Sequence, residues 1–253
     1  MSALDLIEPV EAGAPARRRQ RRVSGTLLVG GVIVGLVIGM ALLSFVWTPH
    51  DPTLVNSQDR LSRPSAEYWF GTDKFGRDVF SQILVGSRTT LFVGFVAVGV
   101  AAVIGVPLGI LAGMAPRWLG ELVMRANDLL LAFPALLLAI MFAAVYGGST
   151  FVAMVAIGVR HVLPNVSSLV IIQGSIGFAI AVLAEAALSF LGFGTPPPTP
   201  SWGRMLQESQ ELLFSAPRLA VFPGVAIALA VLGFNLLGDG LRDRFDPKLQ
   251  DRR

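Results

Sequence analysis

The sequence contains no cysteine among its 253 residues. Disulfide bonds, thiolate metal sites and cysteine nucleophiles are therefore excluded. Histidine is almost as scarce, because the chain has only His50 and His161, far apart in the sequence. A metal site needs several ligands close together, and a catalytic triad needs a histidine beside its nucleophile. Two isolated histidines argue against both kinds of site.

Charged residues are also few, at 15% of the chain, and lysine occurs only as Lys74 and Lys248. Neither lysine follows a glycine, so the chain has no G-x-x-x-x-G-K-[ST] loop to hold the phosphates of ATP. We therefore expect no cofactor on this chain. Arginine supplies most of the positive charge, and the arginines flank apolar runs. That pattern is typical of membrane orientation and argues against a nucleic-acid partner.

Long apolar runs are what the sequence has instead. The chain is 53% hydrophobic, with a mean hydropathy of +0.67, whereas soluble domains are about one quarter charged. The stretch 160–204 is the reference for the other apolar runs, because its residues 166–184 contain no charge. A helix of that length is about 28 Å long, close to the ~30 Å hydrocarbon core of a bilayer. We predict an all-α, polytopic protein embedded in the lipid bilayer.

Charged and apolar segments alternate along the chain and divide it. The run Arg17-Arg18-Arg19-Gln20-Arg21-Arg22 predicts a cytoplasmic N-terminus by the positive-inside rule, and the basic C-terminus predicts the same. The expected segments are a cytoplasmic basic tail (1–23), a first transmembrane helix (24–47), an extracytoplasmic segment (48–88), a core of spans two to six (89–240) and a cytoplasmic tail (241–253).

Two helix faces lead to local expectations. Phe75, Val79 and Ile83 recur every four residues, which predicts an amphipathic helix lying at the outer membrane interface before the second span. In the first span, glycines recur at the same spacing at 31, 35 and 39. This face permits close approach of another helix, although glycine is also common in membrane helices for other reasons.

The fourth span is too short. Residues 149–159 form an apolar run of only eleven residues, which reach about 16 Å as a helix, half a bilayer. Two cytoplasmic termini nevertheless require an even number of crossings. We therefore expect six transmembrane helices, the fourth of them truncated in this sequence. The other spans of the core are predicted at 89–116 (second), 129–146 (third), 166–184 (fifth) and 219–238 (sixth).

Glu185 is the one acidic group near the interior of a span. Such a carboxylate can serve proton coupling or a substrate cation, or it can be satisfied near the outer end of its helix. Candidate positions for a translocation path on the same span are Ser168, Gln173, Gly174, Gly177 and Glu185. Packing against another helix is the alternative for the small and polar positions among these.

Several motifs resemble a known family. These are Phe70-Gly71-Thr72-Asp73 with Gly76-Arg77-Asp78-Val79, Arg160-His161-Val162-Leu163-Pro164-Asn165, Ala184-Glu185-Ala186-Ala187-Leu188-Ser189-Phe190-Leu191-Gly192, Pro197-Pro198-Thr199-Pro200-Ser201-Trp202-Gly203 and Asn235-Leu236-Leu237-Gly238-Asp239-Gly240. In this order they resemble the C-type permease subunit of bacterial dipeptide/oligopeptide ABC importers, over roughly residues 25 to 248.

The resemblance implies a pore-forming subunit of the bacterial cytoplasmic membrane and not an enzyme. A second, homologous B-type permease would complete the path for peptide, and two cytoplasmic ATPase domains would carry ATP and Mg. An extracytoplasmic substrate-binding protein would deliver the peptide. The ATPase-facing candidates are Arg160, His161, Pro164 and Asn165. The candidates for docking the binding protein are Asp73, Arg77, Asp78, Pro197 and Trp202. The resemblance leaves open a related substrate such as glutathione or a nickel chelate.

One part of the family pattern is missing. Family members carry a cytoplasmic E-A-A…G segment between spans four and five, which docks into the ATPase, whereas here Val159 passes directly to Arg160. We hypothesise that the numbering closes over this segment; a genuine deletion would interrupt ATPase coupling. Two other functions stay open, the second of them only if the deletion is genuine. They are a stand-alone secondary transporter, which would need a coupling-ion site at mid-membrane, and a non-transporting membrane assembly subunit.

Overall fold

A computed structural model describes residues 25–132, 137, 140 and 168–245. Within these residues every regular element is helical, and the only β feature is an isolated bridge between Thr72 and Asp78. The elements are α1 (Gly25–Val46), η1 (Ser57–Asp59), α2 (Val79–Met114), α3 (Arg117–Ala132), α6 (Ser168–Phe190), α7 (Trp202–Ser209), η2 (Gln210–Leu212) and α8 (Arg218–Phe245). The expectation of an all-helical chain is confirmed for this part.

Four helices in the described residues are long and apolar enough to cross a membrane. They comprise Gly25–Val46, Val79–Ala112, Gln173–Phe190 and Arg218–Asp243. These correspond to the predicted first, second, fifth and sixth spans. Most of the predicted third span and all of the truncated fourth lie outside the described residues, so the expected number of six stays a prediction.

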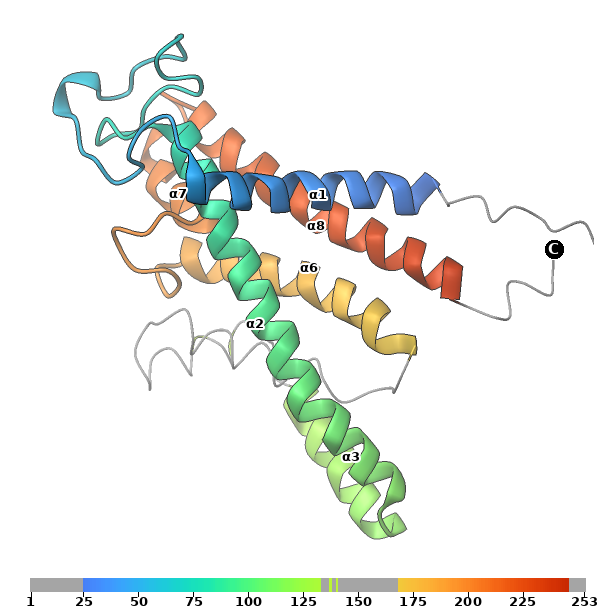
Figure 1. The fold of residues 1–253 in the computed structure, drawn as a ribbon. Helices are drawn as coiled ribbons and strands as arrows, with labels where there is room; N and C mark the ends of the chain where they lie inside the picture. Colours follow the sequence, from blue (N-terminus) through green and yellow to red (C-terminus); the bar gives the residue numbers. More distant parts are fainter. Residues whose placement is uncertain (1–24, 133–136, 138–139, 141–167, 246–253) are drawn as a thin grey trace, which may run out of the picture.

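The membrane helices pack around α8. One side of α8 lies along α1 and another along α6, while α2 crosses α1 and α6 obliquely (Figure 1). The rings of Phe178 from α6 and Phe234 from α8 stack with their centroids 4.0 Å apart. The far part of α2 runs beyond the other helices, with α3 beside it (Figure 1). At the opposite end of α2 lie α7 and residues 48–78, and we call this the α7 end.

Glycine allows α1 and α8 to approach closely. A Cβ atom added at Gly30 would lie 2.5 Å from the backbone nitrogen of Leu237, and one added at Gly240 would lie 2.7 Å from Cα of Leu27. By contrast, nothing lies within 4 Å of a Cβ added at Gly31, Gly35 or Gly39. The predicted glycine face of the first span is therefore wrong as a contact with any described part of the chain. The glycine that contacts α8 is Gly30, one residue before the predicted Gly31.

The predicted interfacial amphipathic helix is also wrong as a separate element. Helix α2 begins at Val79 and continues without a break to Met114, and Phe75 precedes it. Val79 and Ile83 are buried in one apolar cluster with Trp202 and Leu219. The apolar row therefore faces α7 and α8, not lipid. Its periodicity was correct, but α7 covers the face that the sequence assigned to the membrane surface.

Residues 48–78 fold back onto the helix ends. The ring of Phe70 stacks on that of Phe222 in α8, with centroids 4.1 Å apart. Arg218, the first residue of α8, donates hydrogen bonds to the carbonyls of Leu61 and Ser62 at 2.9 and 3.0 Å. These contacts fix the long segment between α1 and α2 against α8.

The α1–α8 contact predicts a position-specific effect of a larger side chain. Gly30→Val should separate the two helices and lower the free energy of unfolding by roughly 1–3 kcal/mol, the usual effect of overpacking. Gly35→Val is the matched control, because open space surrounds that position. Thermal unfolding of the detergent-purified chain measures both. Equal melting temperatures for the two variants would contradict the packing described.

Candidate functional site

Helix α7 is wedged between α2 and α6. The side chain of Ser201 begins it by accepting a hydrogen bond from the backbone nitrogen of Arg204 at 3.3 Å. Trp202 is fully buried, and its indole nitrogen donates to the carbonyl of Ile83 in α2 at 3.0 Å. On the other side, Gly203 lies so close to the carbonyl of Ala186 in α6 that no Cβ fits.

A charged network holds the same helix to the segment before α2. Arg77 Nε donates to Asp73 Oδ2 at 2.7 Å, and a terminal amino group of Arg77 pairs with Glu208 of α7. Glu208 in turn accepts from Arg204 Nε at 2.8 Å. Gln82 donates to Asp73 at 3.0 Å. Each carboxylate thus has a guanidinium partner, which removes the penalty of burying it alone.

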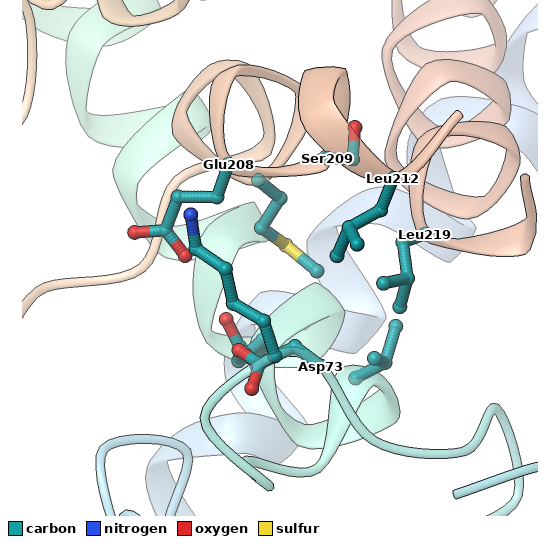
Figure 2. Close-up of a pocket in the computed structure, with 9 residues that line it drawn as sticks. Asp73, Glu208, Ser209, Leu212 and Leu219 are labelled. Atoms are coloured by element: carbon teal, nitrogen blue, oxygen red, sulfur yellow. The ribbon is translucent and has the colours of Figure 1, made fainter. Parts of the chain in front are cut away.

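A small pocket opens beside this network. Figure 2 shows Asp73 and Glu208 toward one side of the pocket, and Leu212 and Leu219 toward the other. The lining residues are Asp73, Lys74, Val79, Gln82, Met205, Glu208, Ser209, Leu212 and Leu219, around about 290 Å³ of space that is partly open to solvent. No cluster of three metal-ligating side chains occurs in the described residues.

Asp78 starts α2. Its carboxylate accepts hydrogen bonds from the backbone nitrogens of Phe80 and Ser81 at 3.3 and 3.0 Å, and Nδ1 of His50 lies 3.5 Å away. Nearby, burial raises the pKa of the Tyr68 hydroxyl, and the carboxylate that accepts its hydrogen bond acts in the same direction. The hydroxyl, which any tyrosine keeps protonated at neutral pH, therefore continues to donate to Asp59 at more alkaline pH than usual.

Glu185 connects α6 to the loop that follows it. The carboxylate is buried, with 4% of the residue exposed, and it accepts a hydrogen bond from Ser189 Oγ at 2.7 Å. Thr195 Oγ1 in the loop lies 3.4 Å from the same oxygen, and the Thr195 backbone nitrogen donates to Ser189 at 3.2 Å. These neutral partners favour the alternative of a satisfied carboxylate at the α7 end of α6, and a place for Glu185 in a translocation path stays a prediction.

The other path candidates lie in different surroundings. Cβ atoms added at Gly174 and Gly177 would make ordinary contacts with Val98 of α2, at 3.6 and 3.9 Å. These two positions therefore favour the packing alternative. Gln173 is exposed on α6. Ser168 is the first residue of α6, and its side chain lies outside the described residues.

The predicted docking residues are mostly buried. Asp73, Arg77, Asp78 and Trp202 have exposed fractions of 9%, 8%, 2% and 0%, and each is engaged by the contacts above. Pro197 alone is exposed, in the loop after α6. Docking therefore stays a prediction, and direct contact with the four buried side chains would require the α7 end to open. The four ATPase-facing candidates, Arg160, His161, Pro164 and Asn165, lie outside the described residues.

Two residues of the charged network were missed in the sequence. Arg204 and Glu208 occupy positions i and i+4 of a short amphipathic segment, a spacing that brings their side chains together on one helix face. That spacing is the signal that could have indicated them. Nothing in the sequence, however, indicates that Glu208 reaches Arg77, which is 131 residues away.

Comparison with known proteins identifies the family. The chain is 38% identical to the dipeptide transport system permease protein DppC of Alkalihalophilus pseudofirmus, over 92% of this chain and 89% of the relative. Residues 156–251 match the family described as "Binding-protein-dependent transport system inner membrane component". The chain belongs to this family. It is a non-catalytic permease subunit of a binding-protein-dependent ABC importer, and the resemblance seen in the motifs is confirmed.

Other relatives carry a different substrate in their names. The permease is 35% identical to the glutathione transport system permease protein GsiD of Pectobacterium atrosepticum, over 99% of this chain and 97% of the relative. It is 36% identical to GsiD of Salmonella typhimurium, over 99% of this chain and 96% of the relative.

The permease is shorter than the relatives it matches. The alignment with Pectobacterium GsiD has 291 positions, 38 more than the 253 residues of the chain. At least that many positions of the alignment have no counterpart here. Val159 and Arg160 are consecutive in the full sequence, so the hypothesis that the numbering closes over unseen residues is wrong. Positions that the relatives have are therefore absent from this chain.

The charged network predicts unequal effects of removing neighbouring cations. Arg77→Met should lower the free energy of unfolding by roughly 3 kcal/mol, because it leaves Asp73 buried without its guanidinium. Lys74→Met is the control. Lys74 lies 3.8 Å from Glu211, whose side chain is 83% exposed, and such surface pairs contribute less than about 1 kcal/mol. Chemical denaturation in detergent compares the variants, and an equal loss in both would exclude a special role for the network.

Proposed function

We propose that this permease carries short peptides across the bacterial cytoplasmic membrane. In this proposal it forms half of the translocation path and a second, homologous permease forms the other half. Two cytoplasmic ATPase domains supply the energy through ATP and Mg, and an extracytoplasmic binding protein delivers the peptide. The observation that carries the proposal is the match to the dipeptide permease DppC over 92% of this chain.

The substrate class follows from what the relatives share. DppC is named for dipeptides and GsiD for glutathione, and glutathione is itself a short peptide with free charged groups. We therefore assign small peptides as the class.

Orientation is part of the proposal. With the basic N-terminal tail in the cytoplasm, the α7 end faces outside. This places the pocket beside Asp73 and Glu208, and the exposed Pro197, on the face where a binding protein would dock. Arg160, His161, Pro164 and Asn165 would then lie on the cytoplasmic face with the ATPases.

A second candidate function is a membrane subunit that assembles without transporting. The observation that favours it is the deficit of at least 38 positions relative to GsiD. Those positions can include the ATPase-docking segment that the motifs place between Val159 and Arg160. In that case the permease has no docking contact through which ATP hydrolysis can change its conformation.

Reconstitution distinguishes the two functions. The permease, its partner permease, the ATPases and the binding protein are placed in liposomes, and uptake of a radiolabelled dipeptide and of glutathione is measured with and without ATP. The matched variant carries an inserted ATPase-docking segment, taken from a relative, between Val159 and Arg160. We expect ATP-dependent uptake by the native chain. Uptake by the inserted variant alone would establish the assembly function, and uptake driven by an ion gradient without ATP would establish a secondary transporter.

Substitutions of Glu185 distinguish ATP-driven transport from proton-coupled transport. Glu185→Gln keeps an oxygen that accepts from Ser189 and Thr195 but cannot carry a proton. We expect uptake within about twofold of the native rate, because a neutral acceptor preserves most of a hydrogen bond. Glu185→Leu removes the acceptor and should lower the amount of folded permease in the membrane. Loss of uptake in the glutamine variant, at normal membrane levels, would instead assign proton coupling to Glu185.

A further inference from the structure

Arg88 is a charged residue within a candidate membrane span. It is the tenth residue of α2 and lies in the apolar segment Val79–Ala112. Its Nε donates to Ser44 Oγ of α1 at 2.6 Å, and its guanidinium carbon lies 4.0 Å from the centroid of the Phe45 ring. The Ser44 hydroxyl in turn donates a hydrogen bond to the carbonyl of Ala41 at 2.7 Å. Arg88 forms no ion pair with any residue in the described ranges.

The depth of this arginine follows from α1. Helix α1 has 22 residues, which is about 33 Å and spans the ~30 Å hydrocarbon core once. Ser44 and Phe45 belong to its last turn, so the guanidinium of Arg88 lies at one boundary of the core. This conclusion holds whichever side of the membrane that boundary faces.

Aromatic side chains mark the same boundary. Trp47 directly follows α1, and its ring centroid lies 6.1 Å from that of Trp69. Both are substantially exposed, at 43% and 51%, as are Phe45 and Val46 beside them. Tryptophan concentrates at the level of the lipid headgroups. The surface around Arg88 is therefore apolar and aromatic, as expected of a face that contacts lipid.

The free donors of Arg88 define the ligand. A guanidinium has five N–H groups, and among the described residues only the Nε group of Arg88 has a protein acceptor. None of the Arg88 nitrogens is among the buried polar atoms without a partner in the described part of the chain, so the two terminal amino groups reach the surface. At a membrane boundary the abundant acceptor is the phosphodiester oxygen of lipid, and the arginine fork binds it with two parallel hydrogen bonds.

We propose that Arg88, oriented by Ser44 and Phe45, binds the phosphate of a phospholipid at the α7 end of α1 and α2. Ser44 fixes the plane of the guanidinium and the Phe45 ring covers one face, so the terminal amino groups are held ready for the phosphate. The bound lipid then lies across the seam between α1 and α2 and stabilises their contact. The site is independent of the peptide substrate and of the ATPases.

A carboxylate from the second permease is the competing occupant. It is less favoured, because the exposed neighbours of Arg88 are apolar and a carboxylate arriving among them would lose water without gaining a second cation. Lipid phosphate arrives in its own headgroup layer and loses less hydration.

Lipid-dependent stability tests the site. The full-length permease, co-purified with its partner permease in detergent, is titrated with dioleoylphosphatidylglycerol, and the rise in melting temperature gives an apparent affinity. Dioleoylglycerol, which has the same chains and no phosphate, gives the chain-only response. We expect Arg88→Gln to weaken the phosphate-dependent affinity about tenfold, the usual effect of losing hydrogen bonds to a charged group. Arg63→Gln, which removes an exposed arginine from the segment between α1 and α2, should leave that affinity unchanged.

Equal affinities for the native chain and Arg88→Gln would overturn the proposal. Loss of the partner permease from Arg88→Gln, with unchanged lipid affinity, would overturn it in favour of a carboxylate. If Arg88→Gln does not fold, Ser44→Ala and Phe45→Leu keep the charge and release the guanidinium. These variants should weaken phosphate binding about threefold, and no weakening in either would again reject the site.

Discussion

The hydrogen bond between the Trp202 indole and the carbonyl of Ile83 is the contact on which the α7 end depends. It crosses 119 residues and joins α7 to α2 inside an apolar cluster, where either group alone would be costly to bury. The close approach of Gly203 to Ala186 places α7 against α6 at the same time. The arginine–carboxylate network then closes the open side of α7. Three helices that are distant in sequence thus end in one packed cap.

This cap limits where the permease can move. The ends of α2 and α6 that contact α7 share buried contacts with it, so a motion that separates them would expose Trp202 and unpair buried charges. Movement that opens a path is less costly where such contacts are few. Among the described helices, the far part of α2 and helix α3 extend away from the others (Figure 1). The exposed side chains there include Val103, Leu111 and Met114.

The sequence predicted the positions of the helices better than the contacts that they make with one another. Uncharged runs located four spans because a bilayer requires an apolar helix of fixed length, and Pro and Gly marked the loops. Periodicity also found the apolar row at Val79 and Ile83. It could not tell that α7 covers this row, since a single sequence carries no information on distant contacts. For the same reason Asp73, Arg77 and Trp202 looked like exposed docking residues although they are buried, and Gly31 was preferred to Gly30.

The pairing of α1 with α8 has a consequence for how the protein is made. Glycines on α1 and α8 let the two backbones approach closely, and this is the most extensive contact between any two of the described helices. Yet α8 leaves the ribosome after every other described helix. During synthesis α1 therefore waits in the membrane with its contact face covered only by lipid or by the insertion machinery. Completion of α8 is the event that closes the bundle, and a chain that stalls before it would present α1 and α6 as unassembled surfaces to membrane quality control.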